Sequence, residues 1–183
     1  MILGTHNSMS YLPLKNWWVA PFNFMARCQK VSYKEQYEKH GVRLFDLRIG
    51  FFSGDCPMFC HGIANYKGDV NNVLRYLNDK GDATVRIVLE KGSEEHFKMW
   101  VAHWRATFRE INWCCGVKKK GWKDLCGLKN IEPYIKHIYS SMQGNLIDDL
   151  CPWLWAKKNK QKMLEQIDEE EPIYVMVDFV EMR

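Results

Sequence analysis

The sequence lacks any run of 18 apolar residues, so we expect no membrane-spanning helix. Its first residues, MILGTHNS, also lack the basic and apolar regions of a secretory signal peptide. We therefore expect a cytoplasmic protein, with peripheral contact at a membrane surface as its closest approach to lipid.

The chain also has no large excess of positive or negative side chains. The 26 Lys and Arg residues against 22 Asp and Glu residues give a net charge of +4 at pH 7. This excess is too small to indicate a nucleic-acid partner, and we expect none. It still favours approach to an anionic surface or substrate.

The cysteines do not form an even set. Seven occur, an odd number, which does not fit the disulfide framework of a small secreted domain. Cys56, Cys60 and His61 could supply part of a zinc site, but no CxxC pair provides a second half. Reduced, buried thiols are the simpler interpretation.

The pattern of apolar residues predicts helices between strands. Hydrophobic residues make up 46% of the 183-residue chain, enough for one packed domain over residues 1–183. Ser32 is the expected N-cap of the first helix, with Gln36 as an approximate capping-box partner. The alternation predicts an α/β fold with largely parallel strands. Strands are expected at 1–6, 42–52, 58–64, 83–92, 111–117 and 172–183, and helices at 32–41, 70–81, 93–110, within 121–142, and at 151–171.

The strand at 42–52 carries charges on one face. Because side chains alternate, Phe45, Leu47 and Ile49 share one face, whereas Leu44, Asp46 and Arg48 share the other. Parallel strands covered on both faces normally carry continuous apolar runs. The charged face therefore points into the interior of a barrel, or it belongs to an internal ion-pair network that only stabilises the fold.

Ionisable residues also occur in three other predicted strands. His6 ends the first strand, Glu90 ends VRIVLE, and Asp178 interrupts YVMVDFV. The carboxyl ends of barrel strands meet at one mouth, where active sites form. A second histidine, His61, follows in FCHG.

Four stretches occur in order over the first half of the chain: GTHNS, SYKEQYEKHGVRLFDLRIG, FCHG and NNVLRYLNDKGDATVRIVLE. Together they resemble the catalytic X region of the phosphatidylinositol-specific phospholipases C, most closely the bacterial enzymes and their phosphodiesterase relatives. The resemblance implies a compact, distorted or incomplete (β/α) TIM-like barrel. The length agrees, since a full barrel takes roughly 200–250 residues.

The resemblance also implies an activity in lipid metabolism, as a phosphoric diester hydrolase or phosphorus–oxygen lyase. It assigns His6 and His61 as general base and general acid, in a reaction that passes through a cyclic inositol phosphate. Arg48 matches the arginine directed at the phosphate. Asp46 would orient Arg48 or a histidine, and Asp178 would hold His6 in one tautomer.

Two positions separate the metal-independent members of this family from the calcium-dependent ones. Asn7 stands where metal-independent bacterial enzymes usually have Asp, and Asn7, Asp46 and Glu90 match calcium ligands of the other members. Arg48 occupies the place of a further carboxylate, where its charge would repel calcium. We therefore expect catalysis without a cofactor, with Ca²⁺ as the alternative. Without the metal, Asn7, Glu90 and Arg48 are the expected substrate contacts.

The head group of the substrate is not fixed by a fold and a catalytic core. A phospholipid or another phosphodiester is expected, with a glycerophosphodiesterase or a catalytically inactive lipid-binding or protein-binding barrel as alternatives. Aromatic residues could stack on a sugar or enter a lipid interface, although packing within the protein is the simpler expectation. These residues are Trp17, Trp18, Phe22, Phe24, Trp153 and Trp155. The sequence does not predict an oligomeric state.

Overall fold

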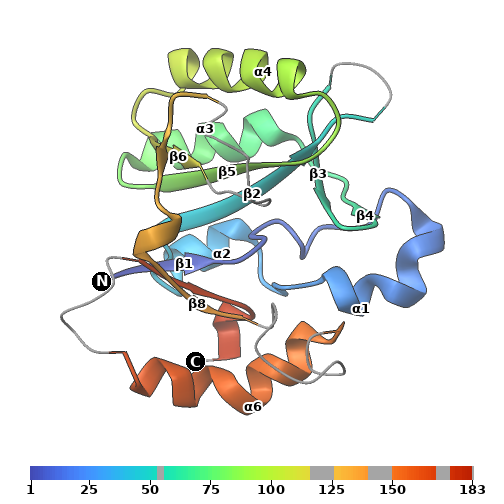
Figure 1. Cartoon of the computed structure of the whole chain (residues 1–183), viewed down its shortest axis with the longest axis vertical. Helices are drawn as coiled ribbons and strands as arrows, with labels where there is room; N and C mark the ends of the chain where they lie inside the picture. Colours follow the sequence, from blue (N-terminus) through green and yellow to red (C-terminus); the bar gives the residue numbers. More distant parts are fainter. Residues whose placement is uncertain (53–55, 116–125, 140–149, 168–173, 183) are drawn as a thin grey trace.

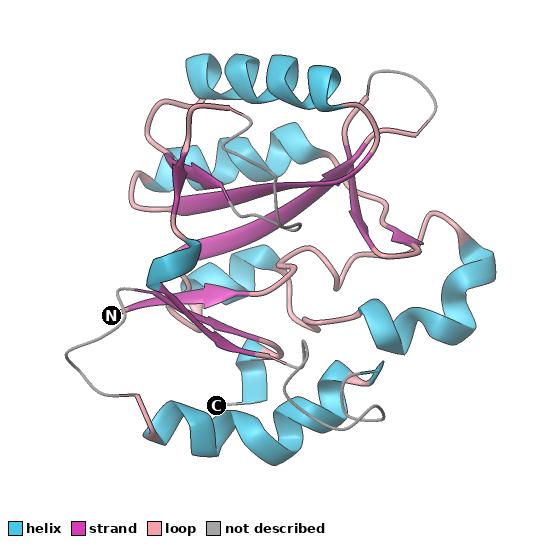
Figure 2. Cartoon of the chain, in the orientation of Figure 1, coloured by secondary structure: helices cyan, strands magenta, loops and turns pink. Residues whose placement is uncertain are grey.

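A computed structural model describes residues 1–52, 56–115, 126–139, 150–167 and 174–182. Its main feature is a sheet of parallel strands that curls into an incomplete barrel (Figure 1; Figure 2). Along the sheet the order is β7-β6-β5-β2-β1-β9-β8, and a short antiparallel pair, β3 and β4, joins at β2. The strands are β1 (Ile2–Thr5), β2 (Leu44–Gly50), β3 (Met58–His61), β4 (Ala64–Asn65), β5 (Thr84–Lys91), β6 (Asn112–Cys115), β7 (Lys129–Asn130), β8 (Ile135–Ile138) and β9 (Tyr174–Val177).

Helices cover the outside of the sheet. In Figure 1, α3 (Val70–Lys80) and α4 (Glu94–Thr107) lie at one end, next to β5 and β6. At the other end, α6 (Pro152–Glu165) lies below β8. The remaining helical elements are short: η1 (Trp17–Phe22), α1 (Asn23–Ala26), α2 (Tyr33–Glu38), η2 (Glu132–Tyr134) and η3 (Val180–Met182). No helix in the described part of the chain is long and apolar enough to cross a membrane.

Capping residues set the ends of the helices. Asp69 accepts hydrogen bonds from the backbone N–H groups of Asn71 and Asn72 at the start of α3, and Gly81, with a φ of 76°, ends that helix. Ser32 caps α2 as predicted, but its capping-box partner is Glu35 rather than Gln36. Three residues separate cap and partner in this motif, and Gln36 lies one position too far.

The side-chain alternation predicted for β2 is confirmed. Phe45, Leu47 and Ile49 are fully buried in the large core beneath the helices. Leu44, on the other face, belongs to a second, smaller apolar cluster with residues of β6, β8 and β9. This cluster lies on the face of the sheet opposite the large core. Gly4 makes room for it, because a Cβ there would lie 2.8 Å from Leu44 Cδ2.

The helix expected within residues 121–142 is wrong for the part that the structure describes. Residues 126–139 contain the strands β7 and β8, joined by the single turn η2. The segment IKHI pairs with β9 as the edge strand of the sheet, so tertiary pairing decides its conformation. Residues 116–125 and 140–149 lie outside the described part.

Candidate active site

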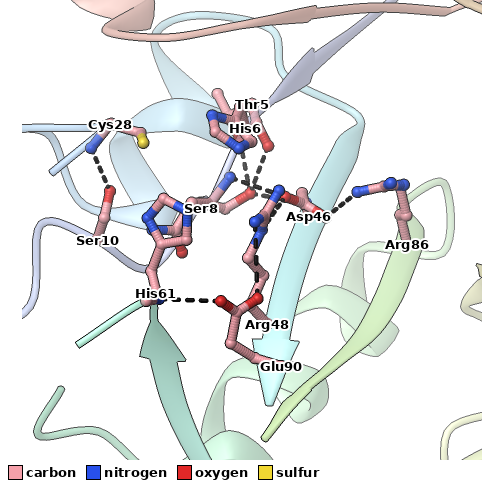
Figure 3. Close-up of polar contacts among 12 residues, drawn as sticks. Thr5, His6, Ser8, Ser10, Cys28, Asp46, Arg48, His61, Arg86 and Glu90 are labelled. Atoms are coloured by element: carbon pink, nitrogen blue, oxygen red, sulfur yellow. Dashed lines mark hydrogen bonds and ion pairs between the residues drawn. The ribbon is translucent and has the colours of Figure 1, made fainter. Parts of the chain in front are cut away.

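The carboxyl ends of the strands bring the predicted site residues together. His6 follows β1, Asp46 and Arg48 lie on β2, and Glu90 lies on β5. His61 ends β3, the antiparallel strand that folds back beside β2. Figure 3 shows these side chains converging on one space. Asp178 follows β9 directly and joins this group by a hydrogen bond with His6.

His6 is buried and held by a carboxylate. Its Nδ1 lies 2.8 Å from Asp178 Oδ1, and both side chains are almost fully excluded from solvent. A carboxylate accepts a hydrogen bond, so the proton of the neutral ring sits on Nδ1 and Nε2 can accept a proton. The ring stacks face to face on Tyr139, with centroids 4.0 Å apart. Burial, and next the positive charge of Arg48, lower the pKa of His6 well below its ordinary value.

The ring of His61 lies edge-on against that of His6. The two ring centroids are 5.6 Å apart and the ring planes are nearly perpendicular, at 88°. His61 Nδ1 donates to the Ala26 carbonyl oxygen at 2.9 Å, which again leaves Nε2 as the proton acceptor of the neutral ring. Burial and then Arg48 lower the pKa of His61 to about 4. Both imidazoles are therefore neutral at pH 7 in the protein without substrate.

Arg48 lies beside both histidines and between two carboxylates. Its Nε donates to Asp46 Oδ2 at 2.9 Å, and its Nη1 lies 3.7 Å from Glu90 Oε2. Burial disfavours the charge, but Asp46 and Glu90 outweigh that effect and raise the pKa of Arg48. A permanent positive charge is therefore held in a largely buried place, with 11% of the side chain exposed.

Asp46 is the centre of the network. Its Oδ1 accepts from Arg86 Nη1 at 2.5 Å, and its Oδ2 accepts from Arg48 and from the backbone N–H of Asn7 at 3.0 Å. Burial disfavours the carboxylate, but the two guanidinium groups outweigh it and hold the pKa of Asp46 far below its usual range. The network thus fixes Arg48 and the turn that follows His6.

Asn7 and Glu90 contact the backbone of the site. Asn7, with a φ of 43°, donates from its side-chain nitrogen to the Ala26 carbonyl oxygen at 3.2 Å, the same oxygen that His61 contacts. Glu90 Oε1 accepts from the backbone N–H of Gly62 at 2.9 Å, next to His61. Both residues therefore hold the segments that position His61.

Three neighbours of the site were not predicted from the sequence. Arg86 lies on β5 four residues before Glu90, so its alternation with Val88 and Glu90 was a usable signal. Tyr139, after β8, and Cys28, after α1, come from segments without periodicity, and the sequence carries no signal for them. All three are buried.

The zinc group considered for Cys56, Cys60 and His61 does not form. Cys56 is exposed, Cys60 is buried, and His61 is oriented by Ala26. Among the described residues, the one group of three or more side chains with metal-ligand spacing is His6, Cys28 and Asp178.

Comparisons with known proteins give matches in structure alone. No family model matches the sequence, and no curated protein matches it. A phosphatidylinositol-specific phospholipase C from Listeria monocytogenes has a TM-score of 0.66 at 15% identity, over 97% of this chain and 87% of that chain. The enzyme of Staphylococcus aureus has a TM-score of 0.64 at 14% identity, over 97% and 85%. A double mutant of that enzyme reaches 0.68 at 13% identity, over 97% and 84%.

At these identities the likeness shows a shared fold. The resemblance and the incomplete barrel predicted from the sequence are confirmed at that level.

Proposed function

We propose that the chain is a phosphodiesterase that cleaves the glycerol–phosphate bond of phosphatidylinositol by general acid–base catalysis with His6 and His61. The observation that supports this most is the contact of the two imidazoles, whose ring centroids lie 5.6 Å apart. Arg48 lies beside them as a fixed positive charge. The shared fold with bacterial phospholipases C adds support.

The first step needs two proton transfers. His6 Nε2 removes the proton of the inositol 2-hydroxyl, and the oxygen attacks the neighbouring phosphorus. The bond from phosphorus to the glycerol oxygen breaks, and a protonated His61 gives its proton to that oxygen, so diacylglycerol leaves. In the second step the roles reverse, and water opens the cyclic phosphate to inositol phosphate.

Arg48 and Asp178 stabilise the charges that develop. The Arg48 guanidinium can donate to the non-bridging phosphate oxygens, where negative charge grows in the transition state. Asp178 stabilises the positive charge on His6 once that ring accepts a proton, which favours His6 as the base. The phosphate of the substrate stabilises the imidazolium of His61 in the same way.

The lowered pKa values predict an acidic optimum. The productive free enzyme has His6 neutral and His61 protonated, and the pKa values of both rings lie below 6.5. The productive fraction therefore falls as the pH rises above 6.5, by about tenfold per pH unit. We expect kcat/KM, measured with EDTA present, to peak below pH 6.5. A maximum of kcat/KM above pH 7.5 would contradict the lowered pKa values of the two imidazoles.

The calcium alternative is not supported by the donor set. Calcium takes six to eight oxygen ligands. Both Asp46 oxygens accept from guanidinium groups, Glu90 lies against Arg48 and the Gly62 N–H, and the Asn7 side chain donates to Ala26. Arg48 supplies positive charge where calcium would lie, so we propose catalysis without calcium.

Removal of calcium is therefore expected to leave turnover unchanged within twofold. The measurement is the initial rate with EGTA and after dialysis, compared with added calcium. A rate that collapses in the chelator and returns with calcium would establish the calcium-dependent alternative.

An exposed aromatic segment next to the site is a candidate for membrane contact. Trp17 and Trp18 in η1 are 81% and 61% exposed, and Phe22 and Phe24 are also exposed. The simpler expectation, packing within the protein, is wrong for these four residues, although it holds for buried Trp155. The segment ends at Ala26, whose carbonyl oxygen orients His61. Aromatic side chains suit the boundary between water and lipid.

We expect Trp17→Ala together with Trp18→Ala to lower the initial rate on vesicles at least tenfold, because the loss of even one large apolar side chain from a lipid interface costs on the order of 1.5–3 kcal/mol. The rate on a soluble, monomeric inositol phosphodiester should stay unchanged. Trp113→Ala is not a suitable control, because that ring is partly buried. Met99→Ala, an exposed apolar residue of α4, is the matched control. Equal losses on both substrates would indicate a structural role instead.

The substrate is tested by offering two classes of phosphodiester to the same preparation and measuring its binding to vesicles beside them. We expect phosphatidylinositol in vesicles to yield cyclic inositol phosphate and diacylglycerol. Turnover of glycerophosphodiesters alone would replace the proposal by a glycerophosphodiesterase. Tight binding to vesicles without turnover of any phosphodiester would indicate an inactive lipid-binding barrel.

A further inference from the structure

Cys28 is a fully buried thiol next to the proposed catalytic histidine, and the mechanism above does not use it. His6 and Cys28 lie side by side in Figure 3. One donor atom each from His6, Cys28 and Asp178 lies within 4.8 Å of the other two. The three residues are 5%, 0% and 0% exposed.

Backbone hydrogen bonds join the three segments that carry these donors. The His6 N–H donates to the Val177 carbonyl oxygen at 2.9 Å, which joins the segments that carry His6 and Asp178. The Cys28 N–H donates to Ser10 Oγ at 2.9 Å, and its carbonyl oxygen accepts from the Phe179 N–H at 2.7 Å. Cys28 is thus tied directly to the residue after Asp178. These bonds keep the three segments that carry the donors close together.

The donor set has one nitrogen, one sulfur and one carboxylate oxygen. Thiolate and imidazole together favour Zn²⁺ and similar borderline ions, whereas Ca²⁺ and Mg²⁺ prefer oxygen ligands alone. Three protein ligands with one remaining position is the usual arrangement of a catalytic zinc site.

From this geometry we propose that His6, Cys28 and Asp178 form a site for Zn²⁺, and that the bound ion inhibits the enzyme. Binding releases one proton, from the Cys28 thiol. The second proton of the group moves within His6, from Nδ1 to Nε2, when the metal takes the place of the hydrogen bond to Asp178. One thiolate and one carboxylate then balance the two charges of the ion, so the buried complex is neutral.

Inhibition follows from which atoms the ion occupies, and this part rests on the proposed function. With the metal on Nδ1, the Nε2 of His6 carries the proton and cannot act as a base. A carboxylate bound to the metal no longer stabilises a protonated His6. The same ion would leave His61, Arg48 and Asp46 in place, so the protein would remain folded and regain activity when the metal is removed.

The test uses binding and activity as separate readouts. The full chain is titrated with Co²⁺, which replaces Zn²⁺ and shows a near-ultraviolet charge-transfer band when a thiolate binds it. We expect one equivalent of Co²⁺ to give this band and Zn²⁺ to abolish it. The variant is Cys28→Ser, with Cys28→Ala as a second substitution in case the hydroxyl disturbs the buried site. Cys56→Ser, which removes an exposed thiol, is the matched control.

We expect Cys28→Ser and Cys28→Ala to lose the band and to need at least tenfold more Zn²⁺ for half inhibition, whereas Cys56→Ser behaves as the parent. EDTA should restore full turnover. A band that persists without Cys28, or equal zinc inhibition in parent and variant, would overturn the proposal. Absence of turnover on any phosphodiester would refute the proposed function, and the cobalt band would still decide the metal site.

Discussion

Substitution of either histidine is expected to remove almost all activity. His6→Ala takes away the proposed base and His61→Ala the proposed acid, and each should lower kcat by about 10²–10⁴-fold. KM should change little, because Arg48 and its carboxylate partners remain in place. The measurement is the steady-state rate of inositol phosphate release from phosphatidylinositol vesicles.

The control for these substitutions is His103→Ala. His103 is an exposed residue of α4, a helix that carries none of the site residues. Its removal should leave kcat within twofold of the parent. Either active-site variant that keeps more than one tenth of the parent rate would exclude its histidine from the proton transfers.

Loss of the charge on Asp46 is expected to have the largest effect on stability. Asp46→Asn keeps the size of the side chain but leaves Arg48 and Arg86 buried beside a neutral amide. Removing one partner of a buried ion pair costs about 3–5 kcal/mol. We expect the free energy of unfolding, measured in urea, to fall by about that amount, and kcat to fall because Arg48 is no longer held in place.

Asp82→Asn provides a surface comparison. Asp82 pairs with Arg43 at 2.7 Å, but its side chain is 53% exposed. An exposed pair contributes about 0–1 kcal/mol, so this variant should unfold close to the parent. If Asp46→Asn cost no more than Asp82→Asn, the buried network would not be the structural centre of the site.

The alternation of side chains along β2 made much of the site predictable. An acid and a base two residues apart on a strand with one apolar face must point away from that face, and Asp46 and Arg48 do so. His6 ends the first predicted strand, whereas Asp178 was expected inside a strand over 172–183 that in fact ends at Val177; the two meet as the barrel arrangement predicted. The contact of Asp178 with His6 is as expected, whereas the catalytic roles stay predictions.

Contacts made by irregular segments could not be predicted in this way. Tyr139 stacks on His6 because β8 pairs with β9 at the edge of the sheet. The sequence of β8 has no hydrophobic periodicity that would predict this pairing. Cys28 and the Ala26 carbonyl reach the histidines from a segment shaped by its tertiary contacts. The exposure of Trp17 and Trp18 was also unpredictable, since aromatic residues without periodicity fit a core as well as a surface.

The most direct test of the central claim is whether the two histidines act as one unit. The measurement compares kcat of His6→Ala, His61→Ala and the double variant on phosphatidylinositol vesicles. Residues that share one reaction step are strongly non-additive, so the double variant should be no more than about tenfold slower than the slower single variant. A double variant whose loss equals the product of the two single losses would show that His6 and His61 act independently, and would contradict the account.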